Sequence, residues 1–473
     1  MRSRFFNFFW LLLLLAGCAP IPDHDTARIS ESFHFNTALN EAMETGDFAS
    51  GDWPSKSWWE DFKDPTLTKL IDAALCLSPT LKKAEARLKA AAQFALQKRA
   101  KLFPEVDFDP SDNWQHLSRN GFFREFAPTI PAVVNDVVIA LSFSYEFDFW
   151  GKNRDLFKAA LGQAAALAAE KNQVELILST SIAYTYAELQ FLLCKQFVLQ
   201  QIETNTQSIM DLRALREAHA LDASIPTLDS QFNTLDVQTE LVAVNQQIQQ
   251  HLHKLKALSG LGQDEVLNIE YQPLNPLVMA LPKELCLDLI ARRPDLVAQK
   301  ARVEAAAKEI SAAKTDFYPD VNLMAAVGFE SVVWSTLFHK RDYAGNLNPA
   351  IHLPIFTAGR LKAQLMEKVE IFNQAVFGYN ELILQTAQEI ADNLSDLILI
   401  QKQIDLRKRS LYTTQEEAEL TLWRAKHALD DRLTLLNAQN VVLRSKLTLA
   451  ELEYGKQLSG ILLIRSLGGG FHN

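Results

Sequence analysis

The chain is poor in the two residues that interrupt helices, because glycine and proline each occur only 17 times among its 473 residues. No proline lies between Pro131 and Pro226 or after Pro354, and no glycine lies between Gly162 and Gly260. Since helices exclude proline and disfavour glycine in their interior, these stretches are where long helices can form. We therefore expect a mostly helical protein with long elements.

Other absences narrow the class of protein. No internal run reaches the roughly 18 apolar residues of a membrane-spanning helix, which excludes a polytopic helical membrane protein. The net charge is −10, from 57 acidic and 47 basic residues, whereas a nucleic-acid binder would show a basic face. Cysteine occurs only four times, and the spacing of Cys76, Cys194 and Cys286 fits no zinc site. We expect these three in the core, with at most one disulfide among them.

The N-terminus has the pattern of an export signal. Arg2 and Arg4 precede an apolar run over residues 5–16, and the sequence Leu-Ala-Gly-Cys ends at Cys18. This pattern predicts a signal peptide over residues 1–17, too short to span a bilayer. The four residues also resemble the bacterial lipobox, which implies cleavage before Cys18 and acylation (palmitate) of that residue. Ala19 in place of aspartate implies no retention in the inner membrane. A signal peptide with an incidental cysteine is the alternative.

Apolar residues recur with the period of a coiled coil. Along the second half of the chain they fall every seven positions, at Val369, Val376, Ile383, Ile390, Leu397, Ile404 and Leu411. Steps of three, four and seven residues also occur over residues 241–255 and 436–461. Such spacing predicts helices that pack along a shared seam. A single helix over about 152–219 would be roughly 100 Å long, too long for a compact domain.

Other segments alternate large apolar residues with small or acidic ones, which is the period of a strand. The clearest segment has apolar residues at Val137, Ile139, Leu141, Phe143, Tyr145, Phe147 and Phe149. We expect four strands, at about 105–117, 136–149, 320–334 and 345–356. Ile139, Leu141, Phe143, Tyr145 and Phe147 then face lipid, since large apolar residues point outward from a membrane barrel. Four strands cannot close a barrel alone, so several chains must share one.

The chain also contains an internal repeat. Residues between Pro79 and Val106 recur at one constant offset between Pro294 and Val321, and the sequence His-Ala-Leu-Asp at His219 recurs at His427. Two consistent offsets indicate a duplication. We expect a lipidated linker over 18–57 and a first repeat over 58–282, with a helical hairpin over about 152–262. A second repeat is expected over 283–473, with a hairpin over about 358–463.

Several motifs resemble those of one protein family. The opening motif is Trp58-Trp59, Phe62 and Asp64-Pro65. The second repeat carries Arg292-Arg293-Pro294-Asp295-Leu296, Phe317-Tyr318-Pro319, Pro354-Ile355-Phe356-Thr357-Ala358-Gly359-Arg360 and Leu433-Thr434-Leu435-Leu436-Asn437-Ala438-Gln439. Together they resemble the outer-membrane efflux lipoproteins of the TolC/NodT type over nearly the whole mature chain.

This resemblance implies a mainly α-helical fold with a β-barrel part. In a homotrimer, twelve strands would form one outer-membrane barrel and twelve helices a periplasmic tunnel. It also implies a periplasmic adaptor and an inner-membrane pump as partners, and a passive exit duct for drugs, metals or small metabolites. A duct for type I protein secretion stays open as an alternative. A non-conducting lipoprotein that spans the periplasm is disfavoured, because such a spacer needs no strands.

No motif for catalysis is present. The sequence has no nucleophile motif, no phosphate-binding loop and no His/Cys ligand spacing. We therefore expect no enzyme activity, no metal site and no cofactor.

The two His-Ala-Leu-Asp sequences mark the turns of the hairpins, which by the resemblance are the periplasmic gate and the contact with the adaptor. The candidate residues are His219, Ala220, Leu221, Asp222, Asp229, His427, Ala428, Leu429, Asp430, Asp431 and Asn437. The family usually has glycine at the positions of Ala220 and Ala428, so we expect a different turn here. Because asparagine stands at the family's acidic position, Asn437, an acidic ring would rest on the four aspartates. Solvated surface roles are the alternative for these residues, and the favoured one for the two histidines.

Overall fold

A computed structural model describes residues 21–29, 49–50, 53–127, 129–272, 280–281 and 292–472. These residues form two compact units. The strand unit contains residues 21–29 and the described parts of 88–167 and 299–379. The helical unit contains the described parts of 49–87, 168–298 and 380–472. Cys18 and Cys286 lie outside the described residues, so the predictions made for them are not addressed by the structure.

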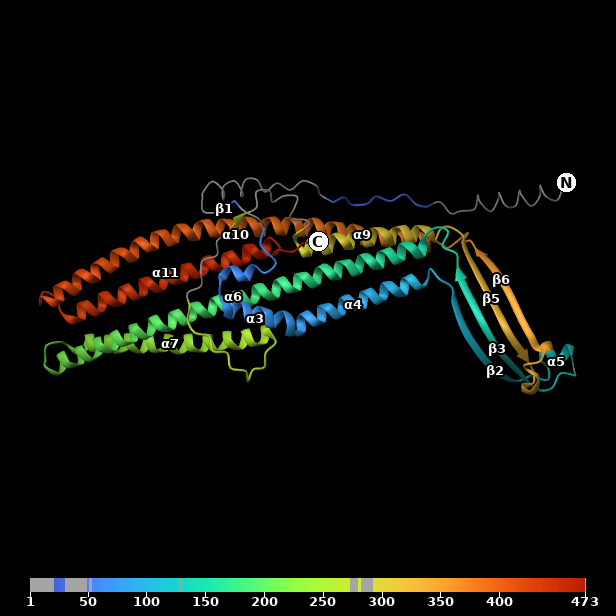
Figure 1. The fold of residues 1–473 in the computed structure, drawn as a ribbon, viewed down its shortest axis with the longest axis horizontal. Helices are drawn as coiled ribbons and strands as arrows, with labels where there is room; N and C mark the ends of the chain where they lie inside the picture. The colour runs from blue at the N-terminus through green and yellow to red at the C-terminus, as the bar shows by residue number, and fades with distance from the viewer. Residues whose placement is uncertain are drawn as a thin grey trace. The chain divides into compact units, whose positions relative to one another are not determined.

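The strand unit is built on a four-stranded antiparallel sheet (Figure 1). Its strands are β2 (Glu105–His116), β3 (Val133–Glu146), β5 (Asp320–Ser331) and β6 (Tyr343–His352), in the order β2-β3-β5-β6. The short helix α5 (Phe122–Phe126) lies between β2 and β3, while η2 (Trp334–Thr336) and η3 (Lys340–Asp342) lie between β5 and β6. The sheet therefore has two edge strands, β2 and β6.

Four helices adjoin the end of the sheet opposite α5, η2 and η3. They are α4 (Pro79–Ala100), α6 (Lys152–Ala218), α9 (Pro294–Thr315) and α10 (Arg360–Lys426), and each of them extends into the helical unit. Small residues allow α6 and α9 to approach closely, since a Cβ atom added at Gly162 would lie 2.9 Å from the Cβ of Ala305. Phe317, Leu361, Leu365 and Val369 form a buried apolar cluster, and Ile21 packs against it.

The helical unit contains two helical hairpins. One is formed by α6 and α7 (Ser224–Ser259), and the other by α10 and α11 (Arg432–Ser466). The seven-residue seam predicted along α10 is confirmed up to Ile404, because Val369, Val376, Ile383, Ile390, Leu397 and Ile404 are all buried, whereas Leu411 is half-buried. One window of α6 is apolar enough to cross a membrane, but 67% of it is buried within the protein, as expected of a core helix.

The double-tryptophan motif anchors the core of the helical unit. Trp58 and Phe62 lie in the short helix η1 (Trp58–Phe62) and are buried with residues of α3 (Pro65–Leu77) and α6. Asp64 caps α3 by accepting hydrogen bonds from the backbone N–H groups of Thr66 and Leu67, at 2.8 and 3.2 Å. The Tyr186 hydroxyl donates to the same carboxylate at 2.7 Å. Burial and this carboxylate raise the pKa of Tyr186 above its usual value, so the phenol stays a donor.

A buried arginine joins three segments of the helical unit. Arg293, just before α9, donates to Asp295 through Nε at 3.0 Å and through Nη2 at 2.6 Å. Its Nη1 donates to Glu389 of α10 at 3.1 Å and to the carbonyl of Ser466 at 3.0 Å. Burial alone would lower the pKa of Arg293, but Asp295 and Glu389 raise it. Arg293 therefore stays charged and links α9, α10 and α11.

The cysteines differ from the prediction. Cys76 and Cys194 are both unpaired, and Cys76 is exposed on α3 while Cys194 is half-buried on α6. The expected core role is therefore wrong for Cys76. Its helix buries Leu67, Leu70, Ile71 and Ala74, and Cys76 falls on the opposite side of that stripe. A minor element, the parallel pair β1 (Ala49–Ser50) and β4 (Ala280–Leu281), had no signal in the sequence.

Candidate functional site

The register of the sheet separates its two faces. Phe143 of β3 lies opposite Val106 of β2 and Ala325 of β5, and Ala325 lies opposite Leu347 of β6. Directly opposed residues in a sheet share a face. One face is therefore apolar across all four strands, and it includes Val106, Phe108, Ile139, Leu141, Phe143, Tyr145, Val321, Leu323, Val327, Phe329, Leu347 and Ile351. Phe147 lies one residue beyond β3, although its N–H still donates to the carbonyl of Val321 at 2.9 Å.

The opposite face of the sheet is small, polar and acidic. Glu105 lies opposite Ser144, and Asp107 lies opposite Ser142. Further across, Glu146 lies opposite Asn322. No lysine or arginine occurs within the four strands. A surface of this kind suits water and dissolved cations, whereas the apolar face suits hydrocarbon.

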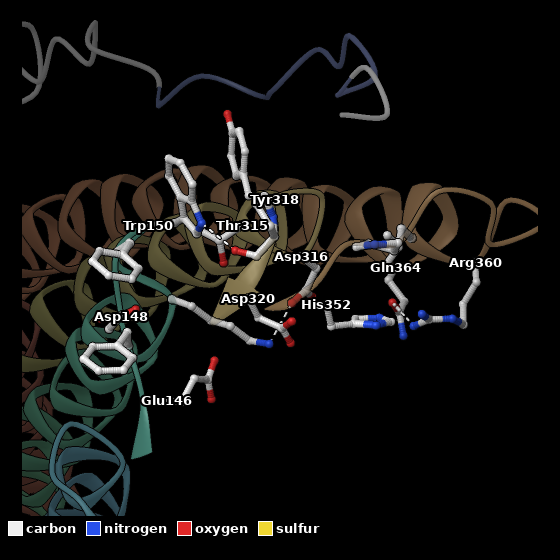
Figure 2. A pocket seen from close by; sticks show the side chains of 16 residues that line it. Glu146, Asp148, Trp150, Thr315, Asp316, Tyr318, Asp320, His352, Arg360 and Gln364 are labelled. Carbon is white, nitrogen blue, oxygen red and sulfur yellow. Dashed lines mark hydrogen bonds and ion pairs between the residues drawn. The ribbon is translucent and has the colours of Figure 1, made fainter. Parts of the chain in front are cut away.

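A charged cluster lies where the sheet meets the helices (Figure 2). Lys152, the first residue of α6, forms an ion pair with Asp316 at 2.8 Å, and Glu146 and Asp320 lie nearby. Burial alone would lower the pKa of Lys152, but these carboxylates, Asp316 foremost, raise it. On the same polar face Asp320 lies opposite His352.

The sequence repeat gives a partial signal for this cluster. Gly151 and Gly359 both have positive φ, at 82° and 85°, and each is followed by the basic residue that begins a long helix, Lys152 or Arg360. The Trp150 indole donates to the carbonyl of Pro319 at 2.8 Å and stacks on Tyr318, so the segments before and after the strands are held together. The cluster places both signs of charge at the end of the polar face.

The turn of each hairpin contains one residue in the left-handed conformation, a position at which glycine is usual. Ala220 has φ 56° and Ala428 has φ 57°. In the first turn the N–H of Ala220 donates to Glu217 and that of Leu221 to Arg216, both at 2.8 Å. This pair of bonds is the Schellman motif, and the second turn repeats it. The expectation of a different turn is therefore wrong, because the two backbone bonds hold alanine in the left-handed region.

Glycine should consequently be tolerated at these turns. A non-glycine residue in the left-handed region costs roughly 1–2 kcal/mol, so Ala220→Gly with Ala428→Gly should leave the melting temperature unchanged or raise it. Ala214→Gly with Ala418→Gly, in the interior of α6 and α10, should lower it, since glycine inside a helix costs about 1 kcal/mol. Thermal denaturation followed by circular dichroism compares the two pairs. If only the turn variants lowered the melting temperature, Ala220 and Ala428 would not be strained by their left-handed conformation.

The candidate aspartates of the turns are mostly engaged within their own hairpins. Asp222 accepts hydrogen bonds from Arg213 at 3.0 Å and from Arg216 at 2.8 Å. Asp430 is paired in the same way with Arg424, at 2.6 Å. These arginines lower the pKa of each carboxyl group. The pairs are therefore present at neutral pH and are lost only as the pH falls below the usual range of aspartate.

Asp431 has a different role and connects the two turns electrostatically. It caps α11 by accepting a hydrogen bond from the N–H of Thr434 at 2.8 Å. Hydrogen bonds from Thr434, together with the charges of Arg216 and Arg213 in the other hairpin, lower its pKa. Asp229 and Asn437 are exposed. Both histidines are exposed as well, and His427 packs against Trp423 with ring centroids 4.2 Å apart and the rings tilted by 33°.

Comparison with known proteins identifies this arrangement of strands and hairpins. The profile of the outer membrane efflux protein family matches the chain twice, over residues 70–261 and 285–469, as the internal repeat predicts. The chain belongs to this family and is an outer-membrane efflux channel component.

Two bacterial relatives and two solved structures show how far the similarity extends. The chain is 30% identical over 432 residues to the multidrug resistance outer membrane protein MdtP of Escherichia coli K12, covering 89% of this chain and 88% of MdtP. It is 31% identical over 393 residues to MdtQ of E. coli O6:H1, covering 81% and 80%. The structure resembles VceC of Vibrio cholerae with a TM-score of 0.78 and 32% identity over 89% of this chain and 100% of VceC. It also resembles the CmeC channel of Campylobacter jejuni, with a TM-score of 0.84 and 20% identity over 96% and 94%.

Proposed function

We propose that three copies of the chain share one twelve-stranded outer-membrane barrel and form a passive exit duct. The observation that carries this proposal is an apolar sheet with two open edges, β2 and β6. In hydrocarbon every backbone N–H and C=O must be paired within the protein, so an open sheet cannot span a membrane. Pairing β6 of one copy with β2 of the next satisfies both edges.

The strand directions permit this closure. Every neighbouring pair from β2 to β6 is antiparallel, so β2 and β6 run in opposite directions. Joining β6 to the β2 of another copy therefore continues the antiparallel order around the ring. The apolar face then points to lipid and the acidic face to the lumen, as in other membrane barrels.

The helices also present apolar surface that one chain does not cover. On α7 an exposed stripe falls at helical spacing, at Ile225, Leu228, Phe232, Leu235 and Val242. On α10 a second stripe falls at Leu384, Leu399, Leu406 and Leu420. Exposed apolar surface of this extent marks an interaction site. In the proposed assembly the stripes meet the helices of neighbouring copies and form the wall of a periplasmic tunnel.

The oligomeric state tests this assembly directly. Mass photometry of the protein purified in mild detergent should give a single species with the mass of three chains. Val242→Glu, in the α7 stripe, should shift the population toward single chains, whereas Glu240→Gln, next to the stripe, should not. A monomer at all concentrations, or trimers unaffected by Val242→Glu, would contradict the proposed interface.

The cargo is proposed to be small molecules, expelled by a pump in the inner membrane through a periplasmic adaptor. Two relatives that are at least 30% identical are named multidrug resistance proteins, which favours this cargo over type I protein secretion. The duct itself has no motif for energy conversion, so the pump would supply the energy and select the substrate.

Lipidation at Cys18 is part of the same proposal. Cys18→Ser should leave an uncleaved precursor that takes up no radiolabelled palmitate, because the lipobox requires the thiol. Cys76→Ser is the matched control and should be processed and labelled normally. Normal labelling of Cys18→Ser would contradict the anchor.

The gate is proposed to lie at the hairpin turns, where Asp222, Asp430 and Asp431 gather near basic residues. The double variant Asp430→Ala with Asp431→Ala leaves Arg424 without its partner and removes the cap of α11. It also removes two negative charges from the turn. We expect weaker cation selectivity and a higher resting conductance in single-channel recordings. Glu416→Ala with Glu417→Ala removes the same charge from exposed positions of α10 and should leave both quantities unchanged. Equal behaviour of the two double variants would place the gate elsewhere.

A further inference from the structure

The positive charge of the barrel-forming segments is confined to two loops. Residues 105–146 and 320–352 contain four lysine or arginine residues, which are Arg119, Arg124, Lys340 and Arg341. Arg119 and Arg124 lie between β2 and β3, while Lys340 and Arg341 lie between β5 and β6. Both loops are at the end of the sheet that lies away from the helices of the strand unit (Figure 1).

Backbone and side-chain bonds hold these two loops against the sheet. The N–H of Leu117 donates to the carbonyl of Ala132 at 2.7 Å, which closes the first loop. In the second loop the indole of Trp334 donates to Asp112 of β2 at 3.0 Å, and Leu337 is fully buried. The two loops are therefore held in a defined position at this end of the sheet.

The four basic side chains have no acidic partner among the residues that the structure describes. Arg119, Lys340 and Arg341 are exposed, and Arg124 is half-buried with its Nε unpaired. Several basic residues near the helical end of the strand unit are paired, as Lys152 is with Asp316, Arg154 with Asp148 and Lys368 with Glu309. Each loop also contains one carboxylate, Glu125 or Asp342, and still carries a net positive charge, which attracts anions.

Exposed aromatic side chains surround these cations. They are Trp114, Phe122, Phe126, Trp334, Phe338 and Tyr343, each between 56% and 77% exposed. Aromatic residues of this kind gather where a membrane barrel crosses the boundary between hydrocarbon and headgroups. The patch is also continuous with the apolar face, because Phe329 contacts both Phe338 and Tyr343. The cations therefore lie at headgroup depth if the sheet spans the membrane.

We propose that Arg119, Arg124, Lys340 and Arg341 bind the phosphate groups of the phosphorylated glycolipid (lipid A) in the outer leaflet of the outer membrane. The inference rests on the proposed function, since it takes the helices as periplasmic and these loops as facing outward. Arginine guanidinium groups bind phosphate in a bidentate manner and lysine binds it as a point charge. The neighbouring aromatic rings would pack against the upper acyl chains. Such contacts would fix the depth of the barrel in the outer leaflet.

Lipid binding to the full-length protein in detergent tests the site. The probes are bisphosphorylated lipid A, its dephosphorylated form and phosphatidylglycerol, counted as bound lipids by native mass spectrometry. The variant is Arg119→Gln with Lys340→Gln and Arg341→Gln, which spares the half-buried Arg124 and should fold. The matched control is Lys82→Gln with Lys83→Gln and Arg87→Gln, which removes three exposed charges from α4.

The wild-type protein should bind the bisphosphorylated form at least about tenfold more tightly than the dephosphorylated form, since each basic residue near an anionic lipid surface contributes measurably. The triple variant should lose this preference and the control should keep it. The proposal would be overturned if the wild-type protein bound both forms of lipid A equally, or bound phosphatidylglycerol as tightly as bisphosphorylated lipid A. It would also be overturned if the triple variant kept the preference or the control lost it. Conductance in a neutral phosphatidylcholine bilayer separates the two claims. If the wild-type protein does not conduct, the proposed function fails. If it conducts but shows no lipid preference, only the glycolipid site is refuted.

Discussion

Phe143→Arg should abolish insertion of the barrel, whereas Ser144→Arg, one residue away, should be tolerated. Phe143 lies in the C-terminal part of β3, between Val106 and Ala325 on the apolar face. A charge on the lipid face of a barrel costs roughly 2–4 kcal/mol at the midplane and less toward the interfaces, and a trimer would carry three of them. Ser144 lies on the polar face opposite Glu105, so an arginine there gains a carboxylate partner.

Two measurements separate these variants. Fractionation of the cell envelope shows how much protein reaches the outer membrane, and gel mobility without heating shows how much is trimeric. Phe143→Arg should be nearly absent from both fractions, while Ser144→Arg should be present and should conduct fewer cations, since it adds positive charge to the lumen. Equal damage from the two substitutions would mean that the sheet does not present its apolar face to lipid.

Arg293→Met should destabilise the helical unit more than any exposed substitution. Its side chain is only 7% exposed and holds Asp295, Glu389 and the carbonyl of Ser466. Removing one partner of a buried ionic network costs about 3–5 kcal/mol, and the lower part of that range applies because Glu389 is 46% exposed. A large fall in melting temperature is therefore expected, together with loss of detergent-stable protein.

The neighbouring arginine is the control for this substitution. Arg292 is half-buried and contacts the ring of Trp53 at 4.9 Å. A cation–π contact of this kind contributes roughly 0.5–1 kcal/mol, so Arg292→Met should lower the melting temperature only slightly. Thermal unfolding followed by circular dichroism compares the two. Similar losses for both variants would show that the ionic network of Arg293 is not what holds α9, α10 and α11 together.

The faces of the sheet could be predicted from the sequence, because alternation with a period of two fixes which residues share a face. The ends of the strands were harder to predict. Apolar alternation continues through Phe147 and Phe149, yet β3 ends at Glu146 because Asp148 accepts hydrogen bonds from the N–H groups of Asn153 and Arg154 and so begins α6. β6 ends at His352, two residues before a proline that cannot donate to a ladder.

Longer-range contacts had no signal in one sequence. The seam of α10 was predictable because a seven-residue repeat records which side of a helix is buried. The contacts of Arg293 with Glu389 and Ser466 join residues far apart in the chain, and no local pattern reports them. The turns show the opposite error. The absence of glycine suggested a different backbone, but two Schellman hydrogen bonds outweigh the cost of a left-handed alanine at each turn.

The central claim, that copies of this chain close one conducting barrel, is tested most directly by recording from purified protein in a planar lipid bilayer. The structure predicts stepwise insertion of trimers, each adding one uniform conductance increment that favours cations because the polar face is acidic. Heat-dissociated chains should add none. Trimers that insert without conductance, or single chains that conduct, would contradict a barrel shared between copies.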